Sequence, residues 1–365
     1  MSRRLELILD LTSRCNIRCT MCYFSATDRL RFKPFDLDTD TRGNMDMDMF
    51  RHVASELFPG ARQVGFGCAA EPLLHPGFSE ILETTHRYLV PHTWIQTNLL
   101  ALTPAIAKAI VASGVRTLAV SIDGTNRKTY ESIRRGASWD RLHQRLRLLD
   151  EAKAASASDL PQLRITFAWM RSNREELATL PAFAEGLGAS ELDVRFVAST
   201  VGVDNRHELL DSEDPEAIMR ELWSVARAAT SRGIRLSAYP AMRKEADADD
   251  SVFGRIARKV WLLKSGIDGP HRWRRSFLER RDGCSFPGRT LLIRPNGAVL
   301  PCPFWEEEPV ALVPRADRTS ILGSDRIAEI RKGLKSGCPV GSCRTCSVKK
   351  DALFRPAVAP PVTGG

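Results

Sequence analysis

The first two hundred residues alternate between short β-rich apolar runs and longer stretches with apolar residues at helical spacing. Gly114 and Gly188 each follow a helical run directly before a short run, a position typical of a helix stop. The pattern predicts strands over residues 5–9, 62–67, 93–96, 115–122, 163–169 and 192–197, and helices over 46–57, 78–89, 104–112, 139–155 and 175–187.

Six strand–helix units in series predict an α/β fold with a parallel sheet, helices outside it and functional loops at the strand carboxyl ends. A helix over 213–231 and a strand over 234–238 follow, and residues 241–283 become irregular and basic. From residue 284 onward, cysteines and a hairpin turn at 295–297 define a smaller module. We therefore divide the chain into a core (1–200), an extension with a basic linker (201–283), a cysteine-bearing domain (284–350) and a disordered tail (351–365).

The composition, 43% hydrophobic and 27% charged over 365 residues, supports a folded core and excludes a disordered or fibrous protein. The first apolar stretch is interrupted by Glu6 and closed by Asp10, and no run of 18 apolar residues exists. Neither a membrane span nor a signal peptide fits, so we expect a cytoplasmic protein. The net charge of +9 indicates a solvated basic face, an anionic substrate or an acidic redox partner, whereas no motif supports nucleic acid.

Nine cysteines, odd in number and clustered, favour thiolate ligands over a disulfide framework. Cys15, Cys19 and Cys22 follow the first predicted strand within eight residues. Such a loop can wrap three corners of a cubane iron–sulfur cluster and leave one iron without a protein ligand. A zinc site is the alternative, but the three-residue gap between the first two cysteines does not match its usual spacings.

The Cys-x3-Cys-x2-Cys spacing resembles that of the radical S-adenosylmethionine superfamily. The resemblance implies a partial (β/α)6 TIM-like barrel and a [4Fe–4S] cluster whose open iron binds S-adenosylmethionine. It also implies reductive cleavage of that molecule to a 5′-deoxyadenosyl radical. The residues that it places at the cofactor are Met21, Ala69, Ala70, Glu71, Thr97, Asn98, Ser121, Asp123 and Arg134.

Residues 67–76 resemble the family's GGEP segment, with Ala69 and Ala70 in place of the two glycines. The resemblance implies that Glu71 accepts a hydrogen bond from the methionyl ammonium. Met21 stands where the family usually has an aromatic residue against the adenine, and Leu99 where it has a glycine.

Three further strand-end motifs follow in family order. Thr97 and Asn98 resemble the family's ribose-side contact, and Ser121 and Asp123 resemble its SxDG motif. Arg134 occupies the arginine of a YxxIRxG run, which implies that it pairs with the methionyl carboxylate. Apart from the resemblance, Ser121, Asp123 and Arg134 are equally typical of strand-end caps and a surface ion pair.

The C-terminal cysteines resemble the SPASM/twitch extension, in the shortened twitch form that holds one auxiliary [4Fe–4S] cluster. A structural zinc ribbon is the alternative that these cysteines also allow. The ligands implied by the resemblance are Cys284, Cys302, Cys343 and Cys346, with Cys338 as a spare or an alternative.

Cys68, beside the expected cofactor segment, has two interpretations. Free cysteines are most often buried and inert, which is the default expectation. A thiol at this place could instead return a hydrogen atom to a substrate radical. Arg171 and Arg195, near the ends of the fifth and sixth strands, are candidates for holding an anionic substrate, or are surface or scaffold arginines.

Only four residues precede Leu5, so a peptide-recognition domain is not expected there, and we favour a small polar metabolite over a peptide substrate. The expected substrate is a sugar, aminocyclitol or nucleotide of natural-product biosynthesis. The expected reaction is hydrogen abstraction followed by oxidation, with flavodoxin or ferredoxin as reductant. Alternatives are epimerisation, sulfur insertion, peptide maturation and, from another class, a zinc-stabilised nucleic-acid-binding protein.

Overall fold

The computed structural model describes residues 5–22, 43–197, 205–210, 213–239, 284, 286–287, 289–305, 307–313, 315–336 and 338–344. Its main feature is a ten-stranded sheet in the order β12-β11-β10-β1-β3-β4-β5-β7-β8-β9. The pairs from β10 to β9 are parallel, and β10, β11 and β12 pair antiparallel. The strands are β1 Leu5–Leu9, β3 Ala61–Phe66, β4 His92–Thr97, β5 Thr117–Ser121, β7 Gln162–Trp169, β8 Glu191–Phe196, β9 Arg235–Tyr239, β10 Thr290–Ile293, β11 Ala298–Leu300 and β12 Ala311–Leu312.

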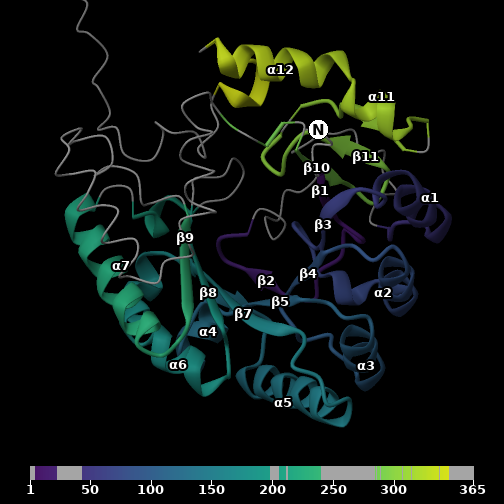
Figure 1. Cartoon of the computed structure of the whole chain (residues 1–365). Coiled ribbons are helices and arrows are strands. Elements are labelled where there is room, and N and C mark those ends of the chain that lie inside the picture. The colour runs from purple at the N-terminus through teal and green to yellow at the C-terminus, as the bar shows by residue number, and fades with distance from the viewer. Residues whose placement is uncertain are drawn as a thin grey trace, which may run out of the picture.

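The helices run along the outer side of the curved sheet (Figure 1). Side chains of Asp46, Thr103 and Ser138 accept backbone N–H groups at the starts of α1, α3 and α5, which explains why these helices begin there. The helices are α1 Met47–Leu57, α2 Phe78–Arg87, α3 Pro104–Ala112, α4 Arg127–Ile133, α5 Trp139–Ala155, α6 Leu180–Gly186, α7 Pro215–Thr230, α11 Arg318–Leu322 and α12 Asp325–Lys335.

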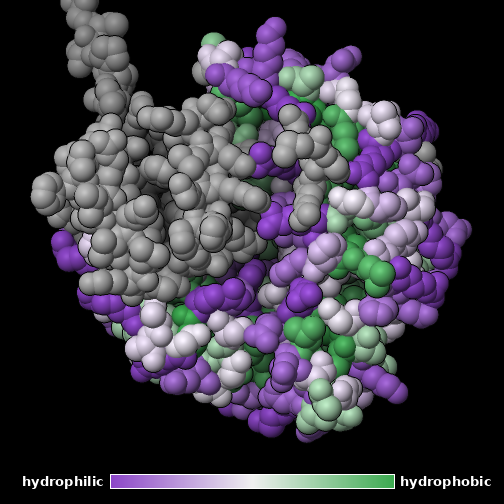
Figure 2. Space-filling model, viewed as in Figure 1, coloured by the Kyte–Doolittle hydropathy of each residue, from purple (hydrophilic) through white to green (hydrophobic). Residues whose placement is uncertain are grey.

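The hydrophobic core lies between the sheet and these helices. Phe66, Ile95 and Leu118 are register partners on adjacent strands, and all three are fully buried. Hydrophilic side chains cover most of the helices' outward surface in the view of Figure 2, as expected for amphipathic helices. No helix in the described part of the chain is long and apolar enough to cross a membrane.

The predicted α/β fold is confirmed, and all six predicted strands lie in the sheet. The strand predicted over 234–238 is confirmed as β9, which extends the sheet at one end. The predicted hairpin is confirmed as β10 and β11, and the sheet is wider than six strands because β10 also pairs with β1 at the other end. The single helix predicted over 175–187 is wrong. A 3₁₀ helix over Arg171–Ala178 precedes α6, whose Pro181 lacks the N–H of a continuous helix and suits a first turn.

Candidate functional site

The cysteine loop leaves the carboxyl end of β1 and is fixed to neighbouring segments by backbone hydrogen bonds. A short strand, β2 (Arg18–Cys19), pairs with β6 (Arg134–Arg135) directly after α4. The N–H of Thr20 donates to the carbonyl of Ile133 at 2.9 Å, and the N–H of Cys22 donates to the carbonyl of Cys19 at 3.2 Å. The spacing of the three cysteines is therefore held by the fold.

Two of the three sulfur atoms receive hydrogen bonds from residues that the sequence places at the cofactor. Asn98 Nδ2 lies 3.8 Å from Cys15 Sγ, and Arg134 Nη1 lies 3.8 Å from Cys19 Sγ. Burial raises the pKa of both thiols, to about 12 for Cys19, and the Arg134 charge opposes the rise. Such donors stabilise thiolate once a metal replaces the proton, so the loop suits a metal or cluster ligand set.

Glu71 stands at the centre of a buried set of hydrogen bonds that joins two strand ends. Its Oε1 accepts from the Thr97 hydroxyl at 2.6 Å and the Leu73 N–H at 3.2 Å, and its Oε2 accepts from the Asn98 N–H at 2.7 Å. Burial raises the pKa of Glu71 to about 7, against these hydrogen bonds and the positive charge of Arg134. A cationic ligand group would stabilise the carboxylate here.

Asp123 and Arg134 form an ion pair at 2.8 Å, and both side chains are buried. Asp123 Oδ1 also accepts from the Ala168 N–H at 2.8 Å. Asn173, which the sequence analysis missed, donates to the carbonyls of Asp123 at 3.0 Å and Ala168 at 2.8 Å. The sequence signal for Asn173 is slight, namely its place just after a predicted strand.

Three buried polar groups next to Cys19 have no hydrogen-bond partner within the described residues. They are Thr20 Oγ1, Tyr130 Oη and Arg134 Nε. Buried polar groups are nearly always satisfied, so unsatisfied ones call for an additional ligand or water. The free N–H of Arg134 suits a carboxylate, and the residues present therefore fit an amino-acid-like ligand beside the cysteine loop.

In the described ranges, no three Cys, His, Asp or Glu side chains converge closely enough to hold one metal ion. A zinc site draws its sulfur ligands to about 2.3 Å from one centre. A cubane cluster spreads its thiolate ligands over separate corners.

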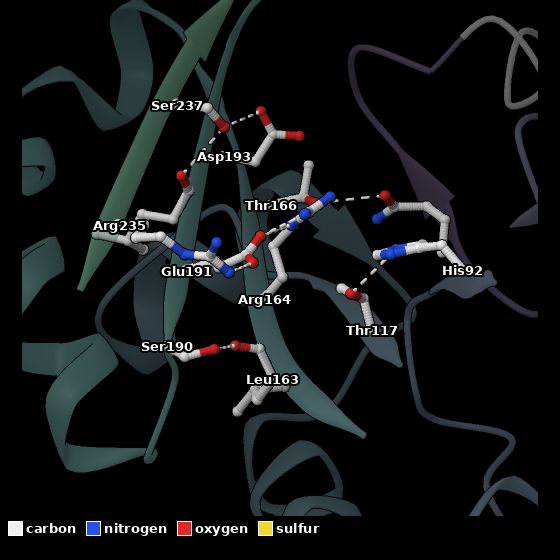
Figure 3. A network of polar contacts seen from close by, with 12 residues as sticks. His92, Thr117, Leu163, Arg164, Thr166, Ser190, Glu191, Asp193, Arg235 and Ser237 are labelled. Carbon is white, nitrogen blue, oxygen red and sulfur yellow. Dashed lines mark hydrogen bonds and ion pairs between the residues drawn. The ribbon is translucent and has the colours of Figure 1, made fainter. Parts of the chain in front are cut away.

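Away from the helices, the inner face of the sheet is polar. Ser121, Thr166, Asp193 and Ser237 are register partners across four adjacent strands. Gln96, from β4, donates to the Ser121 hydroxyl at 2.7 Å and accepts from the Thr166 hydroxyl at 3.3 Å. Figure 3 shows this face, with Thr166, Asp193 and Ser237 directed to the same side. The row offers hydroxyl, amide and carboxylate groups to a polar ligand.

The two arginine candidates are placed differently. Arg195 lies on the inner face, where its Nε and Nη2 contact Asp193 Oδ2 at 2.8 and 2.7 Å, and its side chain is 51% exposed. Ser237 donates to the other oxygen of Asp193 at 3.1 Å. Arg171, on the 3₁₀ helix, contacts Glu213 just before α7 at 3.1 Å. Only Arg195 of this pair therefore borders the polar inner face.

The default expectation that Cys68 is buried is wrong, because the residue is exposed. Gly67, with a φ of 90°, turns the chain at the end of β3 and directs the Cys68 N–H to Asp10. Nearby protein atoms partly desolvate the thiolate and Asp10 repels it, which raises the pKa of Cys68 although Arg294 and Arg195 oppose the rise. Cys68 is therefore a protonated thiol at neutral pH.

The structure brings two of the C-terminal cysteines together. Cys302 and Cys343 are both buried and belong to one small cluster that includes Trp305. Cys284 and Cys338 are exposed. Cys346 lies outside the described residues, as do the basic segment over 241–283 and the tail over 351–365.

Comparison with known proteins agrees with this geometry. The sequence model of the Radical SAM superfamily matches residues 9–158, which include the cysteine loop, Glu71 and Arg134. The tungsten-containing aldehyde ferredoxin oxidoreductase cofactor-modifying protein of Pyrococcus furiosus is 25% identical over 227 residues, 60% of this chain and 59% of that protein. The AdoMet-dependent heme synthase of Methanosarcina barkeri is 27% identical over 222 residues, 60% of this chain and 57% of that protein.

Among solved structures, SuiB of Streptococcus suis bound to S-adenosylmethionine has a TM-score of 0.62 to this chain at 15% identity. The match covers 92% of this chain and 68% of SuiB. This likeness shows a shared fold, that of a partial barrel with a C-terminal extension. The chain matches a little under 60% of the length of the two curated relatives.

Proposed function

Because residues 9–158 match the sequence model of the Radical SAM superfamily, we propose that this protein cleaves S-adenosylmethionine reductively and abstracts a hydrogen atom from a small polar metabolite. One observation carries the proposal: Asn98 and Arg134 donate to the cysteine sulfurs, while Glu71 and the free Arg134 N–H stand beside them. When bound together, a [4Fe–4S] cluster and S-adenosylmethionine supply a 5′-deoxyadenosyl radical.

Different residues of the site bind the cluster and the separate groups of S-adenosylmethionine. Cys15, Cys19 and Cys22 hold the cluster, and Glu71 accepts the methionyl ammonium. Arg134, held by Asp123, directs its free Nε–H to the methionyl carboxylate. The remaining residues assigned to the cofactor are Met21, Ala69, Ala70, Thr97, Asn98 and Ser121.

The polar inner face of the sheet supports the proposed substrate class. Thr166, Asp193 and Ser237 offer alternating donors and acceptors, as a sugar, aminocyclitol or nucleotide requires. Arg195, half-exposed and oriented by Asp193, is the candidate contact for an anionic group, and Arg171 is a weaker one because it lies beside Glu213.

Oxidation of the substrate is the favoured outcome. Oxidation after hydrogen abstraction removes one proton and one further electron from the substrate radical, and an auxiliary [4Fe–4S] cluster, when bound, would supply the acceptor for that electron. The ligands proposed for this cluster are Cys284, Cys302, Cys343 and Cys346, with Cys338 as an alternative. Cys302 and Cys343 belong to the same buried hydrophobic cluster. The net charge of +9 favours an acidic reductant such as flavodoxin or ferredoxin.

Epimerisation is a second candidate, favoured by Cys68. Its thiol is exposed and protonated, and therefore holds a hydrogen atom that it can return to a substrate radical. The thiyl radical that remains regains one electron from the flavodoxin or ferredoxin reductant and one proton from water. In D2O, epimerisation places deuterium from the exchanged thiol at the reacting carbon, and Cys68→Ala abolishes the incorporation. Oxidation yields a product that has two hydrogen atoms fewer than the substrate. Cys68→Ala does not change this mass difference.

The proposal is tested by 5′-deoxyadenosine formation in anaerobically reconstituted protein with S-adenosylmethionine and dithionite. The wild type is expected to form it, with a higher rate when the true substrate is present in a panel of sugars, aminocyclitols and nucleotides. The Cys15/Cys19/Cys22→Ala protein is expected to form none. A reconstituted wild type that binds iron but forms no 5′-deoxyadenosine overturns the proposal.

A further inference from the structure

We propose that Arg294, which follows β10 in the C-terminal part of the chain, is a positioning residue for the segment that binds S-adenosylmethionine. Its guanidinium fixes the carboxylate of Asp10, and that carboxylate holds the backbone of Cys68 and Ala69. The inference rests on the proposed function for its cofactor, but its structural part concerns this chain alone.

Asp10 is the first residue after β1, and it is 2% exposed. Its N–H donates to the carbonyl of Ile293 on β10 at 2.9 Å. Its Oδ1 accepts two consecutive backbone N–H groups, those of Cys68 at 2.8 Å and Ala69 at 3.0 Å. A buried carboxylate thus connects β1 with the turn that leads to Glu71.

Arg294 completes the surroundings of this carboxylate. Its Nη1 lies 2.7 Å from Asp10 Oδ2, and its side chain is 19% exposed. A buried carboxylate that loses its cationic partner is strongly destabilised, because its remaining hydrogen bonds do not replace the lost charge interaction. The orientation of Asp10, and with it the N–H groups of Cys68 and Ala69, therefore depends on Arg294.

The segment from Gly67 to Glu71 is anchored on both sides of these two residues. The N–H of Gly67 donates to the carbonyl of Leu9 at 3.0 Å, and the N–H of Glu71 donates to the carbonyl of Arg14 at 2.9 Å. Asp10 holds the middle of the segment, so a change at Asp10 moves the stretch between the two anchors. Glu71, the proposed ammonium acceptor, lies at its end.

Arg294 also connects this segment to the cysteine-bearing domain. Its N–H donates to the carbonyl of Ala298 at 2.9 Å, which closes the β10–β11 hairpin. The chain reaches Cys302 two residues after β11 ends at Leu300. Cys302, a proposed ligand of the auxiliary cluster, is thus only eight residues from Arg294 along the chain. The hairpin that leads to this ligand therefore also holds the segment from Gly67 to Glu71 in place.

The first experiment measures backbone hydrogen exchange in the protein without cluster or S-adenosylmethionine. In Arg294→Gln, amides in the peptide that covers residues 67–71 are expected to exchange about tenfold faster or more, because the carboxylate that accepts them loses its fixed position. Arg294→Lys keeps the charge and is expected to retain most of the protection. Unchanged exchange in Arg294→Gln overturns the proposal.

Thr290→Val is the matched control. Thr290 lies on the same strand pair and donates to Glu6 Oε2 at 3.4 Å, four residues before Arg294 and away from the Cys68 segment. Its removal disturbs the β1–β10 contact but should leave the exchange of residues 67–71 as in the wild type. If both variants accelerate exchange equally, Arg294 acts only through sheet stability and the proposal fails.

The second experiment measures the Kd for S-adenosylmethionine in the reconstituted proteins. Arg294→Gln is expected to weaken binding about tenfold or more at unchanged iron content, and Thr290→Val to leave it unchanged. Asp10→Asn combined with Arg294→Gln should recover most of the loss, since the neutral amide oxygen still accepts both N–H groups. Failure of the wild type to bind S-adenosylmethionine would refute the proposed function, whereas equal Kd values in wild type and Arg294→Gln would refute the positioning role.

Discussion

The substitution Glu71→Gln tests the electrostatic account of the site, because Glu71 is a buried carboxylate that forms no ion pair with any residue the structure describes. Gln preserves the size of the side chain and the acceptor for the Thr97 hydroxyl. It places an amide NH2 where Oε2 now accepts the Asn98 N–H. That lost hydrogen bond costs about 1–3 kcal/mol at every pH, because the Asn98 N–H is left buried without an acceptor.

The pH-dependent part follows from the pKa of Glu71, which burial raises from 4.5 to about 7. The folded protein binds this proton more tightly than the unfolded chain, so the free energy of unfolding falls as the pH rises from 4.5 to 7 and levels off above it. At about 1.4 kcal/mol for each unit between the two pKa values, the wild type loses about 3 kcal/mol across this range. Gln does not titrate and loses none of it.

The assay is urea unfolding of the cluster-free proteins, followed by circular dichroism between pH 4.5 and 8. The difference in unfolding free energy, wild type minus Glu71→Gln, is expected to decrease by about 3 kcal/mol over this range. Glu80→Gln is the control, since Glu80 is a half-exposed surface carboxylate paired with Arg51. A difference that stays constant with pH would refute the argument that burial dominates the Glu71 environment.

Three further substitutions test other parts of the structure. Asn173→Ala should lower the free energy of unfolding by about 3 kcal/mol, because buried backbone groups lose their hydrogen-bond partners. A decrease in this free energy of less than about 1 kcal/mol, measured by thermal denaturation, would contradict the prediction. Gly297→Ala should lower the free energy of unfolding in urea by about 2 kcal/mol or more. The φ of Gly297 is 81°, and an added Cβ would lie 2.3 Å from a backbone oxygen. An unchanged urea midpoint would count against this prediction. Arg134→Lys keeps the positive charge but loses the forked guanidinium that contacts Asp123 and Cys19 together. S-adenosylmethionine should therefore bind about tenfold more weakly at unchanged iron content, and equal affinity would disprove this role.

The strands could be predicted because their apolar pattern reflects burial against the outer helices. The strand-end motifs then fell close together, since parallel strands bring their carboxyl ends to one edge of the sheet. Glu71, Thr97 and Asn98 are an example: they are separated by 26 or 27 positions and joined by direct hydrogen bonds.

Contacts between distant segments could not be predicted from local pattern. The ion pair of Asp10 and Arg294 joins residues 284 positions apart, and the pairing of β10 with β1 brings them together. Likewise, the turn at Gly67 rather than hydropathy decides that Cys68 is exposed. Asn173 donates to the carbonyls of both Asp123 and Ala168 because the neighbouring strands β5 and β7 end beside it.

The most direct test of the central claim is the iron and acid-labile sulfide content per chain after anaerobic reconstitution. The wild type is compared with the Cys15/Cys19/Cys22→Ala protein. The account predicts that the triple substitution removes about four iron and about four sulfide, the content of one cubane cluster, and leaves the auxiliary cluster in place. An iron content equal to that of the wild type would show that these thiols hold no cluster and would contradict the account.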